Sequence, residues 1–422
     1  MLPRPTVRGW GLAAGGLLLV LLGALLGAVD LVRGGVVALV LVVGAEVGVA
    51  VTVPGRGRHR IEVRRSVDPN PVHVGEAAQV SVDVVAADPA ARVRLAGLRF
   101  AEQAATELSG GLALRARVNR GSGRVSVQYP VRATRRGRWP IGPLVVTHGD
   151  PFGVVRAPTT LGGTADVDVW PQVVALPPPS DVLVDEPDRV ALGARTPSPD
   201  DASLRDYREG DDLRRVHWRS SARRGTLLVR SDERAGMRPV SVLLDQPVRT
   251  SALEWSISLA ASMAIAMLEG GHPVRLVGLD AAGSGPDANG REIPEFVHAR
   301  TGPQARAALL DRTIDLVGPR SDAEAEQRLL DGVRLLETAE GGGEMVLAVL
   351  GPLSAPARAA LVHASSAVHS WAVVRTDGRN PAEAAAAEHT VRALQRAGWR
   401  VCRATVGEDM QDCWRRLLGI AA

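Results

Sequence analysis

The segment from Leu204 to Arg230 concentrates the residues that could do chemistry. It holds arginines, aspartates, a histidine and two aromatic side chains within one short stretch. Acids beside a histidine could act as general acid and base, and guanidinium groups could bind anions. Alternatively, the arginines pack on Tyr207 and Trp218 as cation–π pairs and brace two domains. Structural ion-pair networks and ligand sites look alike in a sequence, and of the two we favour the brace.

The spacing within this segment resembles the signature of the bacterial family called domain of unknown function 58. The family pattern runs Arg-x-Tyr-x-x-Gly-Asp, Arg-x-x-x-Trp, Ser-Ala-Arg and a Leu-x-Val-Arg strand. The matching positions before the strand are Arg205, Tyr207, Gly210, Asp211, Arg214, Trp218, Ser221, Ala222 and Arg223. We take these residues other than Ala222, together with Arg215, as protein-docking or domain-bracing residues. The resemblance implies partnership with MoxR-type AAA+ ring ATPases, and often with membrane-bound transglutaminase-like proteins.

Two hypotheses of function follow. The first is a membrane-anchored scaffold or adaptor that binds such an ATPase and other proteins in an envelope or assembly process. The alternative is a hydrolase or ligand-binding enzyme that uses the neighbourhood of Asp211, His217 and Arg223. The sequence contains neither Gly-x-Ser-x-Gly nor His-Glu-x-x-His, so we predict no enzyme and no cofactor.

The family resemblance also implies that the C-terminal region is similar to a von Willebrand factor A domain. Such a domain holds Mg²⁺ with an aspartate at the end of its first strand and hydroxyls two and four residues later. Asp245 stands at the aspartate position, but Pro247 and Arg249 occupy the hydroxyl positions. We therefore predict a degenerate site without metal, in which Asp245 caps the following helix.

The composition narrows the classes of function further. All 50 basic residues are arginine, which excludes a P-loop or a Schiff-base mechanism in its usual lysine-dependent form. The net charge is only +4 and acids are interleaved with arginines, so nucleic acid is not a predicted partner. The chain has two cysteines, Cys402 and Cys413, and we expect them to be free thiols in a reducing compartment.

The elements that position these residues begin with a predicted transmembrane hairpin at residues 1–54. Residues 11–29 carry no charge and residues 34–53 carry only Glu46, so each run is long enough to cross a bilayer. Asp30 and Arg33 mark a turn between the runs. A signal peptide is the alternative for the first run, but the second run follows at once and favours the hairpin.

Arginines flank both ends of the hairpin. The positive-inside rule then places both ends, and the whole soluble region, in the cytoplasm, with two helices in the cell membrane. Glycines spaced four apart predict a close approach of the two helices. The pairs are Gly11 with Gly15, Gly23 with Gly27, and Gly44 with Gly48.

Short alternating runs over residues 55–176 predict an antiparallel β-sandwich. We place strands at 60–66, 79–84, 92–95, 112–118, 125–131 and 144–147. The Asp-Pro-Phe-Gly sequence at 150–153 resembles a family landmark, and we expect Phe152 to fill the core. A Pro-, Asp- and Ser-rich linker at 177–203 and the signature segment at 204–235 follow.

From residue 236 to 422 five apolar runs alternate with six helical stretches. The predicted strands are 239–244, 273–279, 345–350, 369–374 and 400–406, and the predicted helices are 252–269, 303–316, 322–339, 356–364, 381–397 and 409–418. This alternation predicts an α/β domain with a mostly parallel, doubly wound sheet.

Overall fold

The computed structural model describes most of the chain. The described residues are 3–51, 61–111, 116–177, 204–206, 218, 221–222, 225–226, 228–230, 238–279, 296–298, 302–337, 344–364, 369–377 and 380–419. The chain divides into two compact units, Met1–Trp170 and Pro171–Ala422. The predicted linker lies almost wholly outside the described residues.

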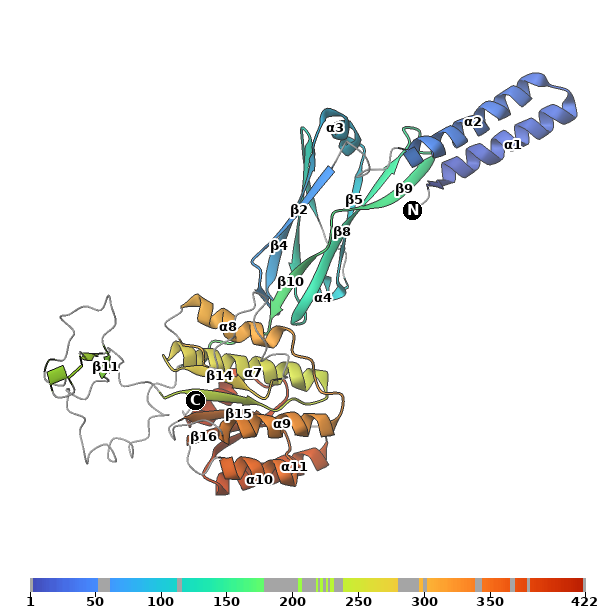
Figure 1. The fold of residues 1–422 in the computed structure, drawn as a ribbon. Coiled ribbons are helices and arrows are strands. Elements are labelled where there is room, and N and C mark those ends of the chain that lie inside the picture. Colours follow the sequence, from blue (N-terminus) through green and yellow to red (C-terminus); the bar gives the residue numbers. More distant parts are fainter. Residues whose placement is uncertain are drawn as a thin grey trace. The chain divides into compact units, whose positions relative to one another are not determined.

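The first unit begins with a pair of long apolar helices, α1 (Val7–Leu26) and α2 (Val29–Val51) (Figure 1). The Thr6 hydroxyl caps α1 by accepting from the Gly9 amide, and Gly27 ends α1 with a φ of 67°. Both helices therefore start earlier than predicted. The predicted turn at Asp30 and Arg33 was wrong, because Asp30 lies in the first turn of α2, where a carboxylate is favoured.

The buried positions of the two helices repeat every seven residues. The buried residues are Gly9, Gly16 and Gly23 in α1 and Gly35, Val42 and Val49 in α2. Seven-residue spacing is typical of a left-handed helix pair. Of the glycines expected at the interface, only Gly23 lies there, while Gly11, Gly15, Gly44 and Gly48 have open space beside them.

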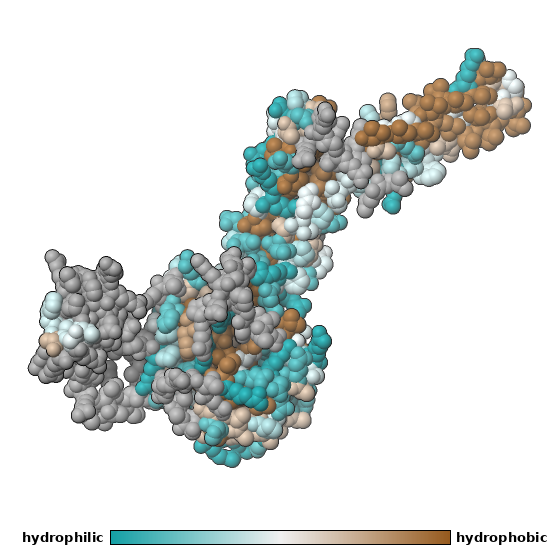
Figure 2. All heavy atoms as spheres, viewed as in Figure 1, coloured by the Kyte–Doolittle hydropathy of each residue, from teal (hydrophilic) through white to brown (hydrophobic). Residues whose placement is uncertain are grey.

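Both helices are long and apolar enough to cross a membrane. Figure 2 shows their hydrophobic outer surface, which contrasts with the mixed surface of the rest of the described chain. A third helix, α7 (Thr250–Glu269), also meets the criteria of length and hydropathy, but 89% of its apolar window is buried. We assign α7 to a protein core.

The rest of the first unit is built from two sheets around one hydrophobic core. The smaller sheet has the order β2-β4-β7-β6, and the larger has the order β1-β9-β8-β10-β3 with β5 beside β8. The strands are β1 (Arg4–Pro5), β2 (Ile61–Asp68), β3 (Val72–His73), β4 (Ala77–Ala86), β5 (Arg99–Ala104), β6 (Arg117–Gly121), β7 (Arg124–Arg132), β8 (Gly137–Gly149), β9 (Val155–Leu161) and β10 (Ala165–Trp170). The pairing is antiparallel except between β10 and β3. The predicted antiparallel sheet region is thus confirmed.

Two local expectations in the sheet region were wrong. Residues 92–95 belong to a helix, α3 (Pro89–Ala96), in which Ala91 and Leu95 are buried. A second short helix, α4 (Thr106–Ser109), follows β5. Phe152 does not fill the core, because 71% of its surface is exposed.

The second unit contains a five-stranded parallel sheet of the order β14-β13-β15-β16-β17. Its strands are β13 (Val240–Leu244), β14 (Val274–Val277), β15 (Met345–Leu350), β16 (His369–Thr376) and β17 (Arg400–Thr405). Four parallel ladders join these strands, and every residue of β13, β14 and β15 is buried. Burial on both faces explains why the strands form continuous apolar runs.

Helices cover both faces of this sheet (Figure 1). One face packs against α9 (Asp322–Glu337), α10 (Ala355–Ala364) and α11 (Pro381–Arg396). The other contacts α7 and α12 (Met410–Leu418), with α8 (Pro303–Ile314) packed on α7. The predicted doubly wound α/β architecture is confirmed, and its element ends lie close to the predicted ones.

Candidate crevice at the sheet edge and the signature segment

The strand order places a topological switch point between β13 and β15. The chain leaves β13 for β14 on one side and later returns to β15 on the other. At such a point the loops after the strands diverge and leave a crevice, where ligands of α/β proteins bind. A cavity of about 540 Å³ lies there, lined by residues that follow β13, β15, β16 and β17.

Asp245 forms the floor of the crevice directly after β13. Its Oδ2 accepts hydrogen bonds from the Gly351 amide at 2.8 Å and from Arg375 Nη2 at 2.9 Å. Arg375 Nη1 also donates to the Asp245 carbonyl at 3.3 Å. The pair is nearly inaccessible, with 6% and 11% of the two side chains exposed. Asp245 therefore joins the ends of three strands rather than capping α7, whose N-cap residue is Arg249.

This arrangement leaves no room for a side chain at Gly351. A Cβ there would lie 2.8 Å from Arg375 Nη2 and 3.0 Å from Asp245 Oδ2. The guanidinium also brings a positive charge to the carboxylate that a metal site of the von Willebrand factor A type would use. Among the described residues no group of three or more His, Cys, Asp or Glu could hold a metal ion. The absence of a metal site stays a prediction.

Gln246 extends the polar floor beneath the crevice. Only 1% of its surface is exposed. Its amide donates to the Gly278 carbonyl at 2.5 Å, and its Oε1 accepts from Arg328 Nη1 at 2.8 Å. Arg328 in turn donates to Glu324 at 2.5 Å. These bonds tie the loop after β13 to α9 and fix the shape of the crevice.

The lining of the crevice has an excess of negative charge. Five acidic side chains and two arginines line it, and both arginines are paired with acids. The lining acids are Asp245, Asp322, Glu326, Asp377 and Glu383. Ser354 donates its hydroxyl to Glu326 and accepts from the Ala357 amide at the start of α10, which is a capping role. The crevice is therefore suited to binding a basic group.

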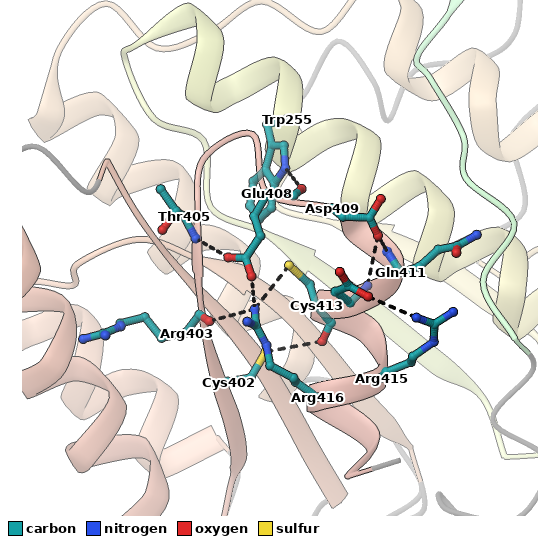
Figure 3. Close-up of polar contacts among 11 residues, drawn as sticks. Trp255, Cys402, Arg403, Thr405, Glu408, Asp409, Gln411, Cys413, Arg415 and Arg416 are labelled. Atoms are coloured by element: carbon teal, nitrogen blue, oxygen red, sulfur yellow. Dashed lines mark hydrogen bonds and ion pairs between the residues drawn. The ribbon is translucent and has the colours of Figure 1, made fainter. Parts of the chain in front are cut away.

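A second polar cluster, drawn in Figure 3, fixes the turn between β17 and α12. Arg416 Nη2 lies 2.6 Å from Glu408 Oε1 and donates to the Arg403 carbonyl at 3.2 Å. Glu408 Oε2 accepts from the Thr405 amide at 2.8 Å, and Trp255 Nε1 donates to the Glu408 carbonyl at 3.1 Å. The cluster joins this turn to α7 and has a structural role.

The two cysteines beside this cluster are free thiols (Figure 3). Burial, together with the neighbouring Cys413, raises the pKa of Cys402 to about 12. Burial and the charge of Glu408 raise the pKa of Cys413 to about 11, although Arg416 opposes this shift. Both sulfurs are therefore protonated at neutral pH and are poor nucleophiles, because the thiolate is the reactive form.

The ends of the signature segment pair with each other. Strand β11 (Leu204–Asp206) runs antiparallel to β12 (Leu228–Arg230), with Arg205 opposite Val229. The strand expected at Leu228–Arg230 is thus present. Between them Ser221 is buried, with 8% of its surface exposed, and its carbonyl accepts from the Gly225 amide at 2.8 Å.

Trp218 is the aromatic residue of the signature that the structure describes, and 64% of its surface is exposed. The residues on either side of Trp218 lie outside the described residues, so the choice between a docking and a bracing role stays a prediction. The other predicted site residues lie outside the described residues, as does the alternative enzyme site. They are Tyr207, Gly210, Asp211, Arg214, Arg215, His217 and Arg223.

Sequence reasoning missed most of the crevice. Asp245 is separated from Arg375 by 130 residues and from Gly351 by 106 residues. No local motif predicts either contact. The position of Asp245 after an apolar strand drew attention to this residue, but the sequence predicted a helix cap there and no crevice.

Comparisons with known proteins add a family but no activity. No curated protein matches the chain. Among solved structures, the GspB Siglec domain is similar over 32% of this chain and 72% of its own, at 15% identity and a TM-score of 0.19. A likeness that slight carries no argument. Residues 203–323 match the family described as "Protein of unknown function DUF58". This match covers the signature segment and the α/β unit as far as the start of α9, so residues 203–323 form a DUF58 family domain.

Proposed function

We propose that this protein is a membrane-anchored adaptor that holds partner proteins at the cytoplasmic face of the cell membrane. Helices α1 and α2 are the anchor, and the α/β unit, similar to a von Willebrand factor A domain without metal, is the binding module. The family resemblance points to a MoxR-type AAA+ ring ATPase as the main partner, and to a transglutaminase-like membrane protein as a second one. The process served would be envelope function or assembly.

Exposed Trp218 carries this proposal. Tryptophan is enriched among the residues that dominate binding energy at protein interfaces. Trp218 lies in the segment whose spacing matches the family signature, and the ribbon of β11 and β12 holds the ends of that segment together. An exposed aromatic anchor supports a docking role for the segment rather than a bracing role.

The acidic crevice supports the same reading. Its paired arginines and its hydrogen-bonded serine hold the lining acids in place, and its charge excess would receive a basic side chain of a partner. An adaptor needs complementary charge and an apolar anchor, and this unit offers both.

The experiment is capture of the ring ATPase by the detergent-solubilised full chain. We expect Trp218→Ala to weaken capture at least tenfold, because truncation of an interface tryptophan commonly costs about 2 kcal/mol or more. Thermal melting should stay unchanged, since Trp218 is exposed. The control is Val317→Ala, which truncates another exposed apolar residue of the same unit.

Two outcomes would contradict the proposal. One is undiminished capture by a folded Trp218→Ala chain. The other is a large loss of thermal stability in Trp218→Ala, which would support a bracing role for the segment instead.

A further inference from the structure

A polar groove lies where the membrane helices meet the sheets of the first unit. Its volume is about 610 Å³, and it is lined by the first turn of α1, by the start of β5 and by the turn between β8 and β9. Arg8, Arg99 and Arg156 line it, and all three are exposed. The one acid in its lining is Asp150.

The single acid does not offset the arginines. Asp150 Oδ1 accepts from the Phe152 amide at 2.8 Å, and Oδ2 accepts from the Val155 amide at 2.6 Å. The carboxylate is thus committed to the turn between β8 and β9. The groove keeps an excess of positive charge, which suits an anionic group.

His148 ties the wall of the groove to the end of α2. Only 7% of its surface is exposed, and it lies in the wall of the groove. Its Nε2 lies 3.1 Å from the Val49 carbonyl, while its Nδ1 is buried with no hydrogen-bond partner among the described residues.

The turn between β8 and β9 is fastened to the start of α1. Thr6 donates its hydroxyl to the Gly153 carbonyl at 2.7 Å and its amide to the Val154 carbonyl at 2.8 Å. A Cβ on Gly9 would lie 2.3 Å from the Val154 carbonyl oxygen, so α1 and the turn touch through their backbones. Val154 and Val155 also share a buried apolar cluster with Val42 and Val49 of α2.

This attachment sets the depth of the groove. Helix α1 has 20 residues and spans about 30 Å, which is the thickness of the hydrocarbon core. Its first turn therefore lies at the membrane surface. Trp10, 66% exposed, occupies that level, where tryptophan is enriched. Phe152 projects from a turn bonded to the same helix start and is 71% exposed.

We propose that this groove binds the headgroup of an anionic phospholipid, with Arg8, Arg99 and Arg156 on its phosphate and Phe152 inserted among the acyl chains. The site rests on the membrane anchoring in the proposed function and adds to it a defined lipid contact. Lipid binding would hold the sheets of the first unit against the bilayer, because the turn that carries Phe152 directly precedes β9.

The test uses the full chain in nanodiscs that contain phosphatidylglycerol and phosphatidylcholine in equal amounts. Phe152 is replaced by the photoreactive p-benzoylphenylalanine, and adducts are identified by mass spectrometry. We expect phospholipid adducts at position 152. The control position is Val118, which is 49% exposed and lies in β6 of the other sheet. It should give no lipid adduct.

Charge recognition is measured separately, by the phosphatidylglycerol that stays bound when the chain is released from the nanodisc. We expect the triple variant Arg8→Gln, Arg99→Gln, Arg156→Gln to lose its preference for phosphatidylglycerol by roughly tenfold or more. The control triple variant Arg92→Gln, Arg117→Gln, Arg132→Gln removes exposed arginines outside the groove lining and should keep the preference. Excess soluble glycerol phosphate should not displace the lipid.

The outcomes separate this proposal from the anchoring itself. A chain that does not remain with the nanodisc refutes the membrane anchor. An embedded chain overturns the headgroup site if position 152 forms adducts with a second protein copy instead of lipid, or if both triple variants retain the preference.

Discussion

At the scale of single residues, the second unit relies on a buried ion pair that closes the edge of its sheet. Removing Asp245 would leave the Arg375 guanidinium uncompensated in a buried position, and it would also free the Gly351 amide. Breaking a buried pair from one side is strongly destabilising, whereas exposed pairs contribute little. The position of this pair therefore matters more than the number of ion pairs in the unit.

We expect Asp245→Ala to lower the free energy of unfolding by about 3 kcal/mol. The matched control is Arg249→Gln, which breaks the neighbouring pair with Asp377. There 54% and 25% of the two side chains are exposed, and we expect a loss below about 1 kcal/mol. Denaturant unfolding of both variants measures the difference. Equal losses would show that the Asp245 pair has no special role at the sheet edge.

At the residue scale, contacts between residues far apart in the sequence could not be predicted. Asp245 was found because it follows an apolar strand, but Arg375, its partner, is 130 residues away. The buried pair of Arg275 and Glu344 spans 69 residues and was not predicted at all. Residue type also misled. Phe152 was expected to fill the core, whereas it is exposed.

At the scale of elements, small residues were correctly expected between the two helices, but their spacing was predicted wrongly. Small residues do line the contact, but they recur every seven residues rather than every four. Gly16 and Gly35 meet across the pair, where a Cβ on Gly35 would lie 2.5 Å from the Gly16 carbonyl oxygen. A Cβ on the adjacent Gly34 would meet nothing within 4 Å.

This contrast gives a prediction with a matched control. Gly35→Val should push the two helices apart, because its side chain must displace the backbone of α1. Gly34→Val adds the same side chain one position away and should leave the pair unchanged. Spin labels on Leu18 and Val37, in a chain without its native cysteines, report the helix separation in lipid by pulsed electron resonance. A pair that stays equally close in both variants would remove the seven-residue interface.

Secondary structure was most predictable in the second unit. Its strands are buried on both faces, and its helices alternate with them, so apolar runs and helical periods mark the boundaries. The predicted strand at 345–350 agrees with β15. In the first unit, residues 92–95 were misassigned, because four residues with an alternating pattern are too few to distinguish a strand from the helix α3.

At the scale of the whole molecule, the chain combines two helices that are long and apolar enough to cross a membrane with a DUF58 family domain at residues 203–323. The apolar helices could be predicted from hydropathy, because a bilayer demands long uncharged runs. The groove beneath them could not, since it combines the first turn of α1 with sheet residues about 90 to 150 positions later. Only the fold brings Arg8 and Arg156 to one groove.

The last prediction concerns the orientation of the anchor. Arg4 precedes α1 and Arg8 lies in its first turn, and five arginines lie between positions 56 and 65 after α2, whereas Arg33 alone lies near the turn between the helices. Short flanking segments rich in arginine stay in the cytoplasm. Reporter fusions after Val53 and at Ala422 should therefore both be active as fluorescent protein and inactive as alkaline phosphatase.

A fusion after Ala28, in the turn between α1 and α2, serves as the control and should show the opposite pattern. The charge difference also allows the orientation to be challenged directly, by replacing Arg56, Arg58 and Arg60 with glutamine. Because arginines near the ends of the helices decide the orientation, this variant should give a mixed population rather than a uniform one. Alkaline phosphatase activity from the unaltered chain at Val53 or Ala422 would place the second unit outside the cytoplasm, and a cytoplasmic ring ATPase could then not be its partner.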